Sequence, residues 1–256
     1  TTYIILSSIG DVAMGEARRR AEKRKAFAKS VKPITRHRFD LFTIGTRKAL
    51  SRLLSSEVSY WSTHDENLLG LVFCDTIDQD FMWTILARDR VGRFRAVEIS
   101  GSNKGVQLAT DMLHERMVTL IAEADISELG FQGDEPNAPY DLLRLEPGID
   151  RSKLHPSFLV LLESPGRVPA RSVMKELGPW LAPSDPHFVS EFQTKGFDQR
   201  IWELYLWAAF RELGFDIEQP EAPDFLCTAP GIKFTVEATT VAASVDGPLA
   251  AHPDPQ

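Results

Sequence analysis

Three apolar runs separated by short polar links constrain the fold of this chain more than any other part of its sequence. The runs cover residues 68–74, 81–87 and 94–99, and each has the length of a typical β-strand. The links at 75–80 and 88–92 contain Asp, Arg and Gly, and short links of this kind join antiparallel neighbours. The sequence therefore predicts an antiparallel meander.

Helical patterns lie on both sides of the meander. Residues 106–124 carry apolar side chains near helical spacing, at Leu108, Met112, Leu113, Met117, Leu120 and Ile121. Residues 11–31 are rich in Ala, Arg, Lys and Glu and precede the helix-breaking Pro33, and residues 47–54 have the length of another short helix. We therefore expect an α+β domain over residues 39–130.

Charge is distributed unevenly along the chain. The net charge is -7, but residues 17–38 hold ten Lys or Arg against the single acid Glu22. That segment carries +9, which leaves -16 for the rest of the chain. A basic helical arm over residues 1–38, attached to an acidic body, can contact the phosphate backbone of nucleic acid. The alternative is a solvated helix face, or one that docks on the protein's own acidic surface.

Composition places the chain among globular proteins. It has 256 residues, of which 43% are apolar and 25% charged, with room for one large domain or two ordinary ones. No apolar run approaches the roughly 20 residues of a membrane span, and the first ten residues lack the pattern of a signal peptide. Cys74 and Cys227 lie far apart in apolar runs, which favours two buried thiols over a disulfide. We therefore expect a cytoplasmic protein with no membrane partner.

The middle of the chain is rich in Pro, Gly and Asp. Residues 130–150 have the composition of an irregular loop, and residues 181–186 resemble them. Between these loops we expect a strand over 158–162 and a short helix over 171–177. The sequence therefore predicts an irregular linker region over residues 131–190.

The last quarter of the chain begins with the strongest helical pattern of the sequence. It covers residues 197–213 and ends at Gly214, a residue type that commonly terminates helices. Strands are expected over 225–228 and 232–240. The Pro-rich tail from Gly247 is expected to be frayed.

Three carboxylates of this last quarter stand in apolar surroundings. Glu203 is the only charged residue of the run 201–210. Asp224 follows Pro223 at the entry of one expected strand, and Glu237 lies inside the next. Acids in apolar elements are costly unless they are paired or bind a cation, so the segment is a candidate metal site.

Each of these acids also has an ordinary explanation. Glu203 can pair with Arg200 or Arg211, and Asp is common in turns. Alternation along 232–240 places Lys233, Thr235, Glu237 and Thr239 on one face and Ile232, Phe234, Val236 and Ala238 on the other. A solvent-facing edge strand has the same pattern.

The order of the three acids resembles that of a known superfamily. Residues 197–240 resemble the PD-(D/E)xK nucleases, whose restriction-endonuclease-like core starts with a helix bearing a Glu and then presents an Asp and an acid-x-Lys on neighbouring strands. Glu203, Pro223-Asp224 and Glu237 match these positions. The segments WELYLWAAFRELGF and VEATTV are also similar to a bacterial branch of this superfamily.

This resemblance implies a metal site with one substitution. It implies that Glu203, Asp224 and Glu237 bind Mg²⁺ or Mn²⁺, which activates water and stabilises charge on the phosphate. Thr239 stands where the superfamily has the lysine that stabilises the nucleophile or the transition state. Lys233 is a substitute on the same strand face, about 13 Å from Glu237 at roughly 3.3 Å per residue. Another lysine, a second metal, or a slow or inactive site are the alternatives.

The resemblance also implies more chain than follows the last strand. The superfamily core continues with another helix and strand, whereas 16 residues follow Thr240, among them Pro248, Pro253 and Pro255. We therefore expect a partial, truncated core over residues 191–256; completion by a second copy, as in a homodimer, or by sequence elsewhere are alternatives. The predicted fold class is α+β: an N-terminal antiparallel sheet with helices, followed by the start of an α/β restriction-endonuclease-like core.

Other site chemistries have weaker support. His114-Glu115 is not followed by the second His of a zinc protease, and six His and two Cys form no zinc pattern. The sequence contains no phosphate-cradling glycine loop and no serine-hydrolase elbow. Asp75, Asp78 and Asp80 lack the Gly and the later Glu of a calcium loop, so we interpret them as part of a hairpin turn.

The sequence therefore predicts a metal-dependent DNA endonuclease that hydrolyses phosphodiester bonds, with defence against foreign DNA as one setting. The alternative is a catalytically degenerate nuclease-like module that binds nucleic acid or a protein. A third hypothesis is a structural or assembly subunit whose meander mediates oligomerisation.

Overall fold

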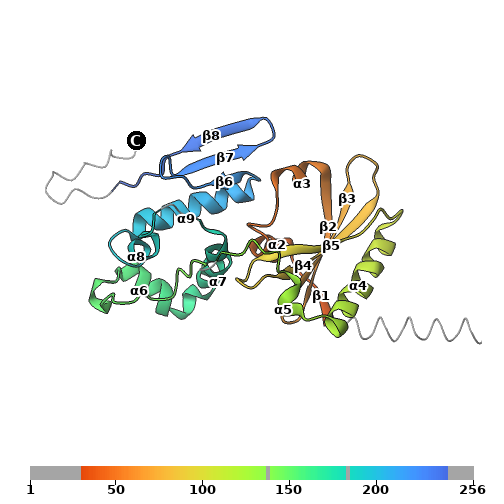
Figure 1. Ribbon diagram of the computed structural model, residues 1–256, viewed down its shortest axis with the longest axis horizontal. Helices are drawn as coiled ribbons and strands as arrows, with labels where there is room; N and C mark the ends of the chain where they lie inside the picture. The colour runs from red at the N-terminus through yellow and green to blue at the C-terminus, as the bar shows by residue number, and fades with distance from the viewer. Residues whose placement is uncertain (1–29, 137–138, 183–184, 242–256) are drawn as a thin grey trace, which may run out of the picture.

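The computed structural model describes residues 30–136, 139–182 and 185–241, and it shows an α+β protein (Figure 1). An N-terminal part, residues 30–136, is built on a five-stranded sheet. A C-terminal part, residues 139–241, contains most of the remaining helices and a three-stranded sheet. No described helix is both long and apolar enough to cross a membrane.

The N-terminal sheet is an antiparallel meander, as the apolar runs predict. Its strands follow one another in sequence order: β1 (Val31–Pro33), β2 (Ser55–Thr63), β3 (Leu68–Asp75), β4 (Phe81–Arg88) and β5 (Phe94–Ile99). Every neighbouring pair is antiparallel. The sequence did not indicate β2, because its run SSEVSYWST contains five Ser or Thr residues and few apolar ones.

Helices cover both faces of this sheet. Helix α4 (Val106–Glu123) confirms the helix expected over 106–124 and packs on one face through Ala109, Leu113 and Met117. Helix α2 (Arg36–Phe42) packs on the opposite face through Phe39 and Phe42. Two shorter helices, α3 (Ala49–Leu54) and α5 (Ile126–Leu129), complete this part. Alternate residues along each strand therefore enter two separate apolar cores.

The structure corrects the boundary of the basic arm. The helix expected over 11–31 lies outside the described residues except at its end, where Ser30 is helical and Val31 belongs to strand β1. Residues 31–38 are thus part of the sheet domain and of α2, and not of a separate arm over 1–38. Pro33 is tolerated in β1 because this strand is at the edge of the sheet.

The C-terminal part contains helices where we expected an irregular linker and a strand. Its main helices are α6 (Pro156–Glu163), α7 (Val168–Leu177), α8 (Phe188–Gln193) and α9 (Phe197–Glu212), with single 3-10 turns at Arg151–Lys153, Pro165–Arg167 and Gly178–Trp180. The prediction of a linker over 131–190 is therefore wrong beyond residue 155. The strand expected over 158–162 is helix α6, which begins with Pro156 in its first turn. A short apolar run is compatible with a strand or with a helix, and Pro156 in the first turn favours the helix.

The small sheet lies along helix α9 (Figure 1). Its strands are β6 (Asp216–Glu218), β7 (Phe225–Ala229) and β8 (Ile232–Val236), all antiparallel. One face contributes to the C-terminal core, with Phe225, Cys227 and Phe234 against the α9 side chains Leu204 and Trp207. The strand expected over 232–240 ends at Val236, and the tail from residue 242 lies outside the described residues.

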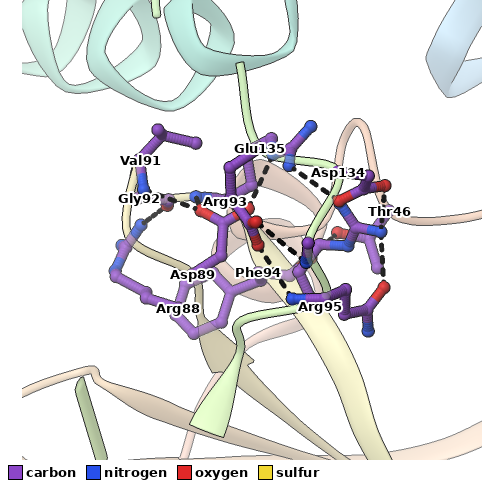
Figure 2. Close-up of polar contacts among 12 residues, drawn as sticks. Thr46, Arg88, Asp89, Val91, Gly92, Arg93, Phe94, Arg95, Asp134 and Glu135 are labelled. Carbon is purple, nitrogen blue, oxygen red and sulfur yellow. Dashed lines mark hydrogen bonds and ion pairs between the residues drawn. The ribbon is translucent and has the colours of Figure 1, made fainter. Parts of the chain in front are cut away.

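Close contacts join the two parts. Arg88 of β4 forms an ion pair with Glu176 of α7 at 2.9 Å. Gly45 lies against the indole of Trp180, so close that a Cβ there would be 2.1 Å from ring atom Cδ2. The segment after α5 is held by Asp134, whose carboxylate accepts hydrogen bonds from both Arg93 and Arg95 (Figure 2).

Candidate functional site

The end of the β7–β8 hairpin brings two of the three predicted ligands next to each other. Phe225 and Val236 are paired across the hairpin. Asp224 directly precedes Phe225, and Glu237 directly follows Val236. The two acids therefore occupy neighbouring positions at the same end of the sheet.

A hydrogen bond fixes Asp224 in this position. Its Oδ2 accepts from the backbone N–H of Ala238 at 2.7 Å. Ala238 is almost fully buried, with 4% of its surface exposed, and packs in the C-terminal core. The Asp224 carboxylate therefore closes the hairpin beyond the last ladder pair.

The other side chains of this segment face solvent. Glu237 and Thr239 are exposed, whereas Val236 and Ala238 between and beside them pack inward. The alternation predicted from the sequence is thus present, although the strand itself ends at Val236. Lys233 is also exposed and pairs with Thr228, at the other end of β8 from Glu237. The structure does not bring Lys233 beside the two acids.

Glu203 lies on α9 and is connected to the same hairpin end through Gln199. Only 5% of Glu203 is exposed. The Nε2 of Gln199 donates to Glu203 Oε1 at 2.9 Å and to the carbonyl oxygen of Ala238 at 2.8 Å. The hydroxyl of Thr240 donates to Gln199 Oε1 at 2.9 Å. One amide side chain therefore links the helical acid to the segment that follows β8.

An arginine pairs with the buried acid. Arg200 Nη1 donates to Glu203 Oε2 at 2.8 Å, and the same guanidinium contacts Glu191 at 2.7 Å and Asp185. Burial alone would lower the pKa of Arg200, but the hydrogen bonds to Glu203 and Glu191 outweigh it and raise the pKa. Arg200 is therefore charged, and the ion pair anticipated as an alternative for Glu203 is present.

Carboxylate and carbonyl oxygens dominate this site. Asp224, Glu237, Glu203 and the Ala238 carbonyl are the hard oxygen donors that Mg²⁺ and Mn²⁺ prefer. Within the described residues, no group of three or more His, Cys, Asp or Glu is placed to hold one ion. Asp224 and Glu237 are adjacent, whereas the Glu203 carboxylate is directed to Gln199 and Arg200.

Of the two residues that position Glu203, Arg200 is expected from the sequence and Gln199 is not. Gln199 and Arg200 precede Glu203 by four and three residues, the spacing at which side chains meet on a helix. The pairing with Arg200 follows from helical spacing, whereas the bridge by Gln199 depends on the position of Ala238 and Thr240, which follow β8. For Gln199, the sequence signal is its spacing of four residues from Glu203, which places the two side chains next to each other on a helix.

Comparison with known proteins adds no relative. No family model, curated protein or solved structure matches this chain.

Proposed function

We propose that the chain is a metal-dependent DNA endonuclease whose site lies at the end of the β7–β8 hairpin. The observation that carries the proposal is the pairing of Phe225 with Val236, which makes Asp224 and Glu237 neighbours. Glu203 is linked to the same place through Gln199 and Ala238. A helical acid and two strand-end acids are the arrangement expected from the PD-(D/E)xK resemblance.

The donor set fits Mg²⁺ or Mn²⁺. Asp224 and Glu237 would hold the ion, whereas both oxygens of the Glu203 carboxylate accept hydrogen bonds from Gln199 and Arg200 and would have to be released before Glu203 could join them. When bound, the ion would supply an activated water and a positive charge at the scissile phosphate. The Ala238 N–H holds the Asp224 carboxylate in place before any ion arrives, which reduces the cost of ordering the site.

The position of the superfamily lysine remains the weakest part of the site. Thr239 has no charge with which to stabilise the transition state, and Lys233 lies at the far end of β8. We therefore expect slow cleavage compared with a site that has a lysine two residues after its acid.

A second candidate function is supported by the ion pair of Glu203. Because Arg200 already compensates Glu203, the site needs no metal for its stability. This observation, together with Thr239, favours a catalytically degenerate module that binds nucleic acid or a protein. Such a module would bind DNA with a steep salt dependence and without a divalent ion.

We propose DNA as the partner and the cytoplasm as the location. Within the described residues, Lys32, Arg36 and Arg38 belong to the basic segment, and the other basic residues of the arm lie outside that range. Cys74 and Cys227 are free thiols, in keeping with a reducing compartment.

Incubation of the full chain with plasmid and linear DNA, with Mg²⁺ or Mn²⁺ and with chelator, tests the proposal. The endonuclease requires metal-dependent cleavage that is lost in Asp224→Asn and Glu237→Gln. Glu218→Gln, a change of an exposed acid in β6 of the same sheet, is the matched control and should cleave like the wild type. Intact DNA with a folded protein would leave the binding module as the better account.

A further inference from the structure

The N-terminal part contains a pocket of about 600 Å³ that the proposed function does not use. It lies on the sheet face opposite α4, next to helix α2. Tyr60, Leu71, Phe73 and Leu86 from three neighbouring strands line it. Helix α2, the turn after it, helix α3 and further strand residues, among them Ala96 and Ile99 of β5, supply the remaining walls. Its volume is within the range of small-molecule sites.

Arg47 lines this pocket with a donor that has no acceptor. Its side chain is only 10% exposed, and its two terminal nitrogens are occupied by Asp40 and Glu57. The Nε atom is buried and has no hydrogen-bond partner within the described residues. A buried donor without an acceptor is destabilising, so a ligand acceptor at this atom would be favourable.

Three cations, Arg36, Arg47 and Lys48, and two acids, Glu57 and Asp75, line the pocket. Arg36 and Lys48 belong to its lining, and their side chains are 69% and 67% exposed. The carboxylate of Glu57 is already matched by Arg47 and by the hydroxyl of Tyr60. Burial and the nearby Glu57 raise the pKa of Tyr60 to about 12, so the phenol stays neutral and keeps donating. Arg36 and Lys48 form ion pairs with Asp40 and Asp216, but both side chains stay largely exposed and can also reach a ligand.

We infer that this pocket binds a single nucleotide. The base would lie on the apolar floor, where the partly exposed rings of Tyr60 and Phe73 provide stacking surfaces. Arg47 Nε would donate to an acceptor on the base, and Arg36 and Lys48 would contact the phosphate. The inference rests on the proposed function in taking nucleic acid as the partner, and it gives the N-terminal part a role in recognition.

Calorimetric titration of the full chain with the four deoxynucleoside 5′-monophosphates tests this inference. At least one should bind with a dissociation constant tighter than about 1 mM. Its nucleoside should bind about fivefold more weakly, since it lacks the phosphate. If no monophosphate binds in that range, the inference is wrong.

Two variants locate the binding. Leu71→Trp fills the pocket and should abolish detectable binding, and circular dichroism reports whether this variant folds. Arg36→Gln changes an exposed side chain and should weaken monophosphate binding about fivefold. Arg151→Gln is the matched control, because Arg151 is equally exposed, is also ion-paired, and lies in the C-terminal part. Equal binding by Arg36→Gln and Arg151→Gln would overturn the inference.

The double variant Asp224→Asn/Glu237→Gln separates this inference from the proposed function. It should lose cleavage and keep nucleotide binding. If the wild type binds nucleotides but never cleaves DNA, the endonuclease proposal fails and the pocket stands. If DNA is cleaved but no mononucleotide binds, the pocket inference fails alone.

Discussion

At the scale of single residues, the ion pair between Arg200 and Glu203 places two charges in the interior of the C-terminal part, where their desolvation is costly. Both side chains are largely removed from water, and each compensates the charge of the other. Such a pair adds little stability over an apolar pair of similar volume, but removal of one partner leaves a buried charge. The stability lost when one partner is removed can be measured whether or not the function is known.

We predict that Arg200→Met lowers the free energy of unfolding by about 3 kcal/mol. The Glu203 carboxylate would lose its cation, and Glu191 and Asp185 would lose theirs. The double variant Arg200→Met/Glu203→Leu should recover most of this loss, because no buried charge is left unpaired. Urea denaturation at constant pH measures both. A double variant as unstable as the single one would show that the ion pair is not the cause.

His114 of α4 gives a second prediction at this scale. Burial lowers the pKa of His114 to about 4, from an ordinary value near 6.5, and Asp111 opposes the shift. Between these two values the unfolded chain binds a proton that the folded chain does not. Stability should therefore fall as the pH drops from 6.5 to 4, by less than the full pKa shift would give because solvent screens this partly exposed residue.

The variant His114→Gln tests the origin of this pH dependence. It removes the titrating group, so the loss of stability between pH 7 and pH 4.5 should be smaller than in the wild type. Denaturation curves at both pH values give the difference. An unchanged difference would assign the acid sensitivity to other groups.

At the scale of elements, the stability of helix α2 depends on its N-cap residue. Thr35 is the N-cap, and its hydroxyl accepts from the backbone N–H of Arg38. The helix has seven residues and buries Phe39 and Phe42 against the sheet. Thr35→Ala should destabilise the protein by about 1 kcal/mol. Thr35→Ser keeps the capping hydroxyl and should be close to wild type, and thermal unfolding of the two variants provides the comparison.

The elements predicted correctly are those with long or repeated patterns. Helices α4 and α9 each carry an apolar stripe over four or more turns, and strands β3, β4 and β5 are separate apolar runs. Short elements were missed or misassigned. Helix α8 and strand β6 have six and three residues, too few to show a period. In α6, five consecutive apolar residues hid the helical period.

The candidate site was predictable in part for the same reason. Asp224 directly precedes β7 and Glu237 directly follows β8 of one hairpin, and hairpin neighbours follow from sequence order. The contacts of Glu203 are different. They depend on Gln199 reaching a chain segment almost forty residues later, a tertiary contact that no local pattern encodes.

At the scale of the whole molecule, the joint between the two parts is tightly packed. Gly45 has no room for a side chain beside Trp180, so Gly45→Ala must displace the indole or the backbone. We predict a destabilisation of about 1–3 kcal/mol. Gly101→Ala is the control, since a Cβ there meets no atom within 4 Å. Chemical denaturation followed by tryptophan fluorescence should separate the variants, and equal stability would contradict this account of the joint.

The clasp that Asp134 forms with Arg93 and Arg95 has a consequence for how this protein would act on a polymer (Figure 2). Asp134, in the segment after α5, is hydrogen-bonded to Arg93 and to Arg95 of β5. The ion pair between Arg88 and Glu176 is a second contact, and it joins the two parts. The nucleotide pocket and the acids at the hairpin end would therefore keep one spacing. A cut made by such a protein would fall a constant number of nucleotides from the base bound in the pocket.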